Sequence, residues 1–308
     1  MPLEKGGGKK GVMAFQFKQP ENMQEALALL AEYGDEAKII AGGSALVLML
    51  QQKLLDPKIL ISLKKVAELD YERNDSQGLH LGAMVGLSHL EKSTRIKDEY
   101  RGLALACGEV GNIRVRNQAT LGGNLAEADY ASDPPAMLLA LDASVSATGP
   151  KGRRDIPISE FFLGFYTTAL EPDEILTGIS IPPLPHGGRS TYLKFRSRSS
   201  EDRPLVGVGA VAMFDDQVCR ELRLAVGAAC ETPQRIADLE DLARGESLSE
   251  ELITEIAEGY ANNIETLDDL RGSAWYRKQM IRVNVTRTLR QISAPPLEKG
   301  SEVRDGNW

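Results

Sequence analysis

Two pairs of adjacent glycines are the residues of this 308-residue chain best suited to bind an anion. The first pair lies in Ala41-Gly42-Gly43-Ser44, and the second lies in Thr120-Leu121-Gly122-Gly123-Asn124, ahead of a polar stretch that ends at Asp133-Pro134-Pro135. A glycine pair lets the backbone approach a pyrophosphate and turn its N–H groups toward it, and a helix that follows adds favourable partial charge. Neither segment has the lysine of a Walker motif or the spacing of a Rossmann fingerprint. Together they predict a site for one long anionic group.

The first glycine pair is predicted to follow a strand in a βαβ-like unit. Asn22 and Glu25 have the spacing of a capping box, so a helix is expected to begin there and to end at Gly34. The expected elements that follow are a strand over 37–40, the glycine segment, a helix over 45–54 and a strand over 59–62. This order places the glycines at the carboxyl end of a strand, where α/β folds tend to bind ligands.

The rest of the chain predicts a mixed α+β fold. The Pro182–Gly188 stretch is the strongest linker signal. Strands are expected over 79–83, 145–147, 175–181, 192–197, 206–214 and 218–226, and helices over 101–107, 137–141, 236–243, 250–262 and 274–291.

A third glycine motif, Gly207-Val208-Gly209-Ala210-Val211-Ala212, matches a relaxed dinucleotide fingerprint. Asp215 and Asp216 follow too soon to leave room for the helix whose N-terminus would hold a phosphate. Gly207 and Gly209 are therefore interpreted as small residues on one face of a strand.

Composition excludes several classes of protein. A net charge of −8 and a pI near 5.2 argue against a general nucleic-acid binder. No window approaches the roughly 20 apolar residues of a membrane span, and the first residues lack a signal-peptide core, so a cytoplasmic protein is expected. Cys107, Cys219 and Cys230 have no close partner in the sequence, and the histidines are scattered, so reduced thiols and no metal site are predicted.

Four motifs in order resemble a known family. They are Ala41-Gly42-Gly43-Ser44, the run from Arg116 to Ala126 around the second glycine pair, Ser132-Asp133-Pro134-Pro135, and Tyr192-Leu193-Lys194-Phe195. The chain resembles, over about residues 14–292, the FAD-binding medium subunit of the xanthine dehydrogenase and carbon monoxide dehydrogenase type of molybdenum hydroxylase.

The resemblance implies an α+β fold in which a two-part FAD-binding domain of the PCMH type precedes a C-terminal domain with a small antiparallel sheet and helices. The expected divisions are a flexible leader over 1–13, FAD subdomains over 14–66 and 67–185, the C-terminal domain over 190–292, and a loose tail over 293–308.

The resemblance also implies the residues that bind FAD. The first segment would wrap the pyrophosphate and adenosine side, the second would approach the phosphates from the other side, and Asp133 would accept a hydrogen bond from the flavin. The implied cofactor-binding residues are Ile40, Ala41, Gly42, Gly43, Ser44, Ala45, Leu46, Val110, Thr120, Gly122, Gly123, Asn124, Asp133, Leu176, Tyr192 and Lys194. No catalytic residue is implied.

Several of these residues have a purely structural alternative. A strand-to-helix turn needs glycine whether or not it binds phosphate, and an Asp before Pro is often an N-cap. Tyr192 and Lys194 share one face of a strand, where the family has an aromatic residue and a lysine near the flavin; without the resemblance, a half-buried tyrosine and an exposed lysine are expected. Leu176 and Val110 are equally plausible as core residues.

One departure from the family pattern is Tyr130, where relatives commonly have proline. Its ring could pack on the cofactor or close off the approach of an oxidant. The chain also lacks the four-cysteine insertion that gives hydroxybenzoyl-CoA reductases an extra cluster in this subunit, so only flavin is expected here.

The implied function is electron transfer. Two [2Fe–2S] clusters of a small partner subunit would pass electrons to FAD from the molybdenum cofactor of a large subunit, and FAD would pass them to an external acceptor. The resemblance implies that these subunits form a dimer of heterotrimers. Two alternatives remain open: a self-sufficient flavin oxidoreductase of the vanillyl-alcohol-oxidase or enolpyruvyl-reductase type, and a scaffold without flavin.

Overall fold

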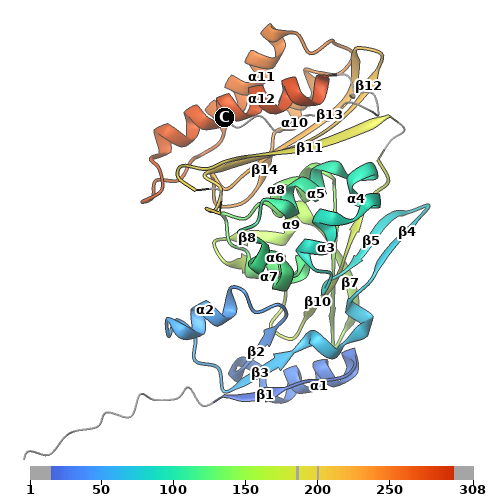
Figure 1. The fold of residues 1–308 in the computed structure, drawn as a ribbon, viewed down its shortest axis with the longest axis vertical. Coiled ribbons are helices and arrows are strands. Elements are labelled where there is room, and N and C mark those ends of the chain that lie inside the picture. The colour runs from blue at the N-terminus through green and yellow to red at the C-terminus, as the bar shows by residue number, and fades with distance from the viewer. Residues whose placement is uncertain (1–14, 185–186, 200, 295–308) are drawn as a thin grey trace, which may run out of the picture.

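The computed structural model describes residues 15–184, 187–199 and 201–294. The expected leader over 1–13 and all but two residues of the expected tail lie outside these ranges. Figure 1 shows three parts stacked along the long axis, each built on its own sheet. None of the helices within the described ranges has the length and apolarity needed to cross a bilayer.

The N-terminal part is a three-stranded parallel sheet in the order β1-β3-β2. Its elements are β1 (Gln16–Lys18), α1 (Met23–Tyr33), β2 (Ala37–Ile40), α2 (Leu46–Gln51) and β3 (Ile59–Ser62). The Asn22 side chain accepts from the N–H of Glu25 at 2.9 Å, and Gly34 ends the helix with φ +48°, as the capping pattern predicts. The glycine segment leaves the carboxyl end of β2.

The central part is a five-stranded antiparallel sheet in the order β4-β5-β10-β6-β7, with helices packed beside it. Its strands are β4 (Glu72–Asp75), β5 (Gly78–Gly82), β6 (Ser144–Gly149), β7 (Gly152–Pro157) and β10 (Ile175–Ile181), with the small hairpin β8 (Phe162–Gly164) and β9 (Thr167–Thr168). Its helices are α3 (Leu87–Lys92), α4 (Thr94–Glu99), α5 (Arg101–Gly108), α6 (Ile113–Gln118), α7 (Leu121–Glu127), α8 (Pro134–Ala140) and α9 (Ile158–Phe161).

The C-terminal part is a four-stranded antiparallel sheet covered on one face by helices. Its elements are β11 (Gly188–Phe195), β12 (Val206–Asp215), β13 (Val218–Gly227), β14 (Gln234–Arg235), α10 (Ala237–Asp241), α11 (Glu250–Asn263) and α12 (Ala274–Ser293). Gly207 and Gly209 lie within β12, which confirms that the third glycine motif is a strand. β11 begins at Gly188, earlier than predicted, because it pairs with β12 from that residue onward.

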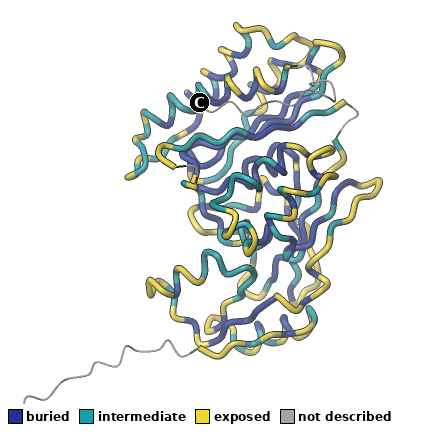
Figure 2. The backbone as a smooth tube through the Cα atoms, in the orientation of Figure 1, coloured by how far each residue is buried: buried dark blue, intermediate teal, exposed yellow. Residues whose placement is uncertain are grey.

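Helix α8 joins the central part to the C-terminal sheet. All seven of its residues are buried, and Figure 2 shows a concentration of buried residues where the two parts meet. A Cβ built on Gly209 would lie 2.8 Å from the Cα of Met137, so the sheet must carry glycine there. Just beyond the helix, Asp142 forms an ion pair with Arg223 at 2.7 Å. This close packing fixes the two parts against each other.

Candidate functional site

The two predicted glycine segments touch in the folded chain. A Cβ built on Gly42 would overlap the carbonyl oxygen of Gln118 and would lie 2.7 Å from its carbonyl carbon. A Cβ on Gly123 would lie 3.4 Å from that of Ala41. Gly42 is therefore required by a close approach between backbones, and residues far apart in the sequence meet at one place.

The first segment has polar groups without a protein partner. The hydroxyl of Ser44 is buried, and it forms no hydrogen bond with any residue that the structure describes. Within the described ranges, the backbone N–H groups of Gly43 and Ser44 also donate to no protein acceptor. Gly43 has φ +76°, a conformation that side chains with a Cβ rarely adopt. Because a buried polar group without a partner is costly, the Ser44 hydroxyl indicates a place where an external acceptor could bind.

The second segment is not the open loop that its glycines suggest. Thr120 is the N-cap residue of α7, and its side-chain oxygen accepts from the N–H of Gly123 at 3.0 Å. The N–H of Gly122 donates to the carbonyl oxygen of Ala83 at 3.0 Å. A Cβ built on Gly122 would lie 2.6 Å from the Cβ of Ala83. The N–H of Asn124 donates to the Thr120 carbonyl at 3.0 Å. These N–H groups therefore have protein partners, and packing by itself explains Gly122.

Asp133 lies at the centre of a buried polar cluster. One carboxylate oxygen accepts from the Tyr192 hydroxyl at 2.8 Å, and the other accepts from the Lys194 ammonium at 3.0 Å. The ammonium also donates to the Glu109 carbonyl at 2.7 Å. The side chains of Lys194 and Asp133 are 1% and 3% exposed. The expectation of an exposed lysine is wrong, because a carboxylate and a carbonyl from other elements enclose it.

Asp133 does not act as a capping side chain. It occupies the N-cap position of α8, but its carboxylate makes no capping hydrogen bond. Burial raises the pKa of Asp133 to about 7, although Lys194 and Tyr192 act in the opposite direction. Burial, with the neighbouring Asp133, holds the pKa of Tyr192 well above its ordinary value, so its hydroxyl remains a donor.

Two family models match almost the whole of the described chain. Residues 13–184 match the FAD binding domain in molybdopterin dehydrogenase, and residues 191–292 match the CO dehydrogenase flavoprotein C-terminal domain. This chain is an FAD-binding medium subunit of the molybdenum hydroxylase family. It is accordingly the flavoprotein subunit of a molybdenum-dependent dehydrogenase, an oxidoreductase.

Relatives extend over most of this medium subunit. It is 33% identical over 277 residues to the 6-hydroxypseudooxynicotine dehydrogenase complex subunit alpha of Paenarthrobacter nicotinovorans, covering 90% of this chain and 93% of that one. It is 30% identical to the carbon monoxide dehydrogenase medium chain of Hydrogenophaga pseudoflava, covering 89% of this chain and 96% of that one. The solved structure of that dehydrogenase lacking the Mo-pyranopterin moiety has a TM-score of 0.87 at 30% identity, over 91% and 97% of the two chains. The two-part FAD domain and C-terminal domain are thus the family fold.

The cluster and the glycine segments of this medium subunit are connected through neighbouring residues. Ser132 donates to the side chain of Asn124 at 2.9 Å, which joins the segment before α8 to α7. Val110 follows Glu109, whose carbonyl accepts from Lys194. A single connected region therefore contains most of the predicted site. The sequence analysis missed Ser132 and Glu109 as partners, although Ser132 stands beside Asp133 in a quoted motif.

Leu176 differs from the other predicted site residues. It lies on β10, is 5% exposed, and belongs to the hydrophobic core beside the five-stranded sheet. This position agrees with the core alternative, and its contact with a cofactor stays a prediction.

Tyr130 is held by the C-terminal part. Its hydroxyl donates to Asp269 at 2.7 Å, and the Arg271 guanidinium lies 5.0 Å from its ring centroid and also contacts its hydroxyl. The ring packs edge to face with Phe165 at 5.2 Å. Asp269 in turn accepts from the fully buried Arg277 at 2.8 Å. The hydroxyl of Tyr130 therefore connects two parts of the chain, a role that the sequence analysis missed because its partners lie about 140 residues away.

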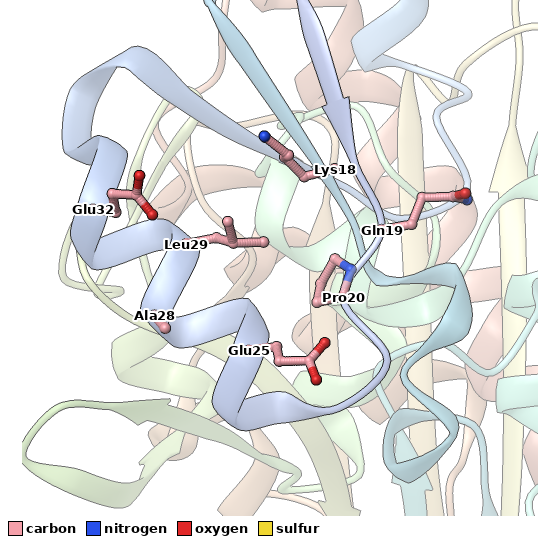
Figure 3. Close-up of a pocket in the computed structure, with 7 residues that line it drawn as sticks. All are labelled: Lys18, Gln19, Pro20, Glu25, Ala28, Leu29 and Glu32. Carbon is pink, nitrogen blue, oxygen red and sulfur yellow. The ribbon is translucent and has the colours of Figure 1, made fainter.

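The hollow drawn in Figure 3 does not belong to this region. It lies between α1 and the end of β1, with Lys18, Glu25 and Leu29 among its lining residues. It contains none of the predicted cofactor-binding residues.

Proposed function

We propose that this chain binds one FAD across the junction of its two glycine segments and transfers electrons from iron–sulfur clusters of a partner subunit to an external acceptor. The observation that supports the proposal most directly is the junction itself. Gly42 lies against Gln118, and the buried Ser44 hydroxyl beside it lacks a protein acceptor. A pyrophosphate offers the oxygens that such donors need.

The residues at the junction fit the cofactor. The Ser44 hydroxyl and the N–H groups of Gly43 and Ser44 donate to no acceptor in the described part of the chain, so they would hold the pyrophosphate. The N–H groups of Gly122 and Gly123 already have protein acceptors, so these residues would support the site through packing and partial charge at the start of α7. The full proposed set is the sixteen residues named in the sequence analysis, with Leu176 contributing from the core.

FAD supplies the redox chemistry, because a flavin can take up electrons singly and release them in pairs. The chain itself binds the cofactor, orients it and sets its electrostatic surroundings. Asp133, Tyr192 and Lys194 form the charged group that would act on the flavin. Because Asp133 lies against Lys194, the lysine is not an isolated positive charge. Its effect on the flavin therefore depends on the state of Asp133.

The proposed partners are a large subunit with the molybdenum cofactor and a small subunit with two [2Fe–2S] clusters, in a dimer of heterotrimers in the cytoplasm. The names of two relatives, a dehydrogenase complex subunit and a dehydrogenase medium chain, support assembly with further subunits. In this arrangement the substrate reacts in the large subunit, and the present chain is where electrons leave the complex.

The test is to purify the chain alone and together with candidate large and small subunits. The chain alone should bind one equivalent of FAD, with absorbance bands near ~370 and ~450 nm, but should oxidise no substrate. Adding the partners should allow substrate to reduce the flavin. Reduction by substrate without partners would instead support a self-sufficient flavin oxidoreductase, and a folded chain that binds no FAD would support a scaffold.

A further inference from the structure

The cluster of Asp133, Tyr192 and Lys194 is unusual for a structural element. Its ion pair is almost completely buried, and burial of two charges commonly costs as much free energy as their attraction returns. Apolar residues of similar size would fill the same space at no electrostatic cost. A buried ion pair in an FAD-binding subunit is therefore a candidate for a group whose charge state is used.

We infer that Asp133 is a proton-accepting site whose protonation accompanies reduction of the flavin. This inference rests on the proposed function, because it requires FAD to bind beside the cluster. The geometry allows the carboxyl group to exist in both states. As a carboxylate it accepts from Tyr192 and Lys194, and as an acid it retains an oxygen that can still accept from either donor.

Among Asp133 and the titratable groups packed around it, Asp133 is the one that can change its charge near neutral pH. From β11, Tyr192 and Lys194 contact it directly. From the end of α5, the Glu109 carboxylate is paired with Arg196 at 2.6 Å, and burial keeps the pKa of the Cys107 thiol well above its ordinary value. Burial also raises the pKa of Asp133 to about 7. The same effect raises the pKa values of Tyr192 and Cys107 further above neutral pH, so these two groups stay protonated there. Asp133 is thus the member of this group that can take up a proton near neutral pH.

The protons and electrons balance as follows. Reduction of a bound flavin by two electrons from the iron–sulfur clusters and one proton would add one negative charge in total. A second proton from solvent then enters the Asp133 carboxylate, which leaves the Lys194 ammonium uncompensated and able to offset that charge. In sum, two electrons and two protons are taken up. Without a protonatable group at position 133, two electrons and one proton are taken up.

The experiment is a redox titration of the FAD-loaded chain at several pH values above about 7, where Asp133 begins as a carboxylate. The two-electron midpoint potential of the wild-type protein should change twice as much per pH unit as that of Asp133→Asn. Difference infrared spectra should show a protonated carboxyl band on reduction of the wild type and no such band in the variant. Asp142→Asn removes an acid beyond the other end of α8, and should keep the wild-type slope.

Because Asp133→Asn leaves a buried lysine without its partner, the double variant Asp133→Asn with Lys194→Met provides a neutral cluster that should fold. Its midpoint potential should show the same small change per pH unit as that of Asp133→Asn. The inference is overturned if the midpoint potential of either variant changes with pH as steeply as two protons per two electrons require. It is also overturned if the potential of the wild type changes only as one proton per two electrons requires. Failure of every protein to bind FAD is seen separately in the absorbance spectrum, and overturns the proposed function instead.

Discussion

The backbone of Gly42 rests directly on the carbonyl group of Gln118. Gly42 lies in the connection between β2 and α2, and Gln118 is the last residue of α6. Their approach leaves no space for a Cβ on Gly42. The position of the first glycine segment is therefore set by the segment that leads into the second one.

Replacing Gly42 by Ala should remove FAD binding and destabilise the chain. The new methyl group would overlap the Gln118 carbonyl, so the two segments must separate, at a cost of about 1–3 kcal/mol. Denaturant unfolding and FAD retention after gel filtration measure the two effects. Gly86→Ala is the matched control, because its Cβ would meet only the Ala119 carbonyl oxygen, at 3.9 Å. A Gly42→Ala protein with full FAD would contradict the assignment.

Replacing Ser44 by Ala should weaken FAD binding while leaving the FAD-free chain as stable as before or slightly more so. The hydroxyl has no protein partner to lose, and a hydrogen bond to a charged phosphate contributes about 1.5–3 kcal/mol, or roughly a 10- to 100-fold change in Kd. Calorimetric FAD titration and thermal unfolding test this. Thr288→Val removes another buried hydroxyl without a partner, in α12, and should leave the affinity unchanged. An unchanged Kd for Ser44→Ala would remove this hydroxyl from the site.

Replacing Tyr130 by Phe should loosen the connection between the central and C-terminal parts. The variant loses the hydrogen bond to Asp269, a charged acceptor, so the free energy of unfolding should fall by about 1.5–3 kcal/mol. Urea unfolding measures the loss, and Tyr166→Phe serves as a control because the residue Tyr166 is about half exposed, at 51%. No loss of stability would show that the Asp269 contact contributes nothing to the connection.

The stability gap between the wild type and Asp133→Asn should change with pH. The pKa of Asp133 is about 7 in the folded chain and about 3.9 when unfolded, so the folded state binds more protons between these values. The gap in unfolding free energy, wild type minus variant, should fall as pH rises from about 4 to about 7, by at most about 1.4 kcal/mol per pH unit. Above about pH 7 it should stay constant. Urea unfolding at several pH values tests this, and a gap that widens with rising pH would contradict the assignment.

Local signals in the sequence predicted many of the elements. Asn22 and Glu25 marked the start of α1, and the alternating apolar residues of 175–181 gave β10 with its observed limits. These features depend on residues within one turn or one strand, where capping and side-chain periodicity act directly. The third glycine motif was also interpreted correctly, because the aspartates after it left no room for a helix.

Features that depend on distant partners were less predictable. Lys194 was expected at the surface in the absence of family resemblance, but Asp133 and the Glu109 carbonyl bury it. The glycine at position 122 suggests a phosphate-binding loop, but the close approach of Ala83, which leaves no space for a Cβ on Gly122, is enough to require glycine there. In each case the deciding partner lies on another element, and local propensity contains no information about it.

The most direct measurement is a crystal structure of this chain with FAD. The pyrophosphate should lie within hydrogen-bond distance of the Ser44 hydroxyl and the Gly43 N–H, beside the junction of Gly42 and Gln118. Density for the pyrophosphate at another place, such as the hollow beside α1 in Figure 3, would contradict the account.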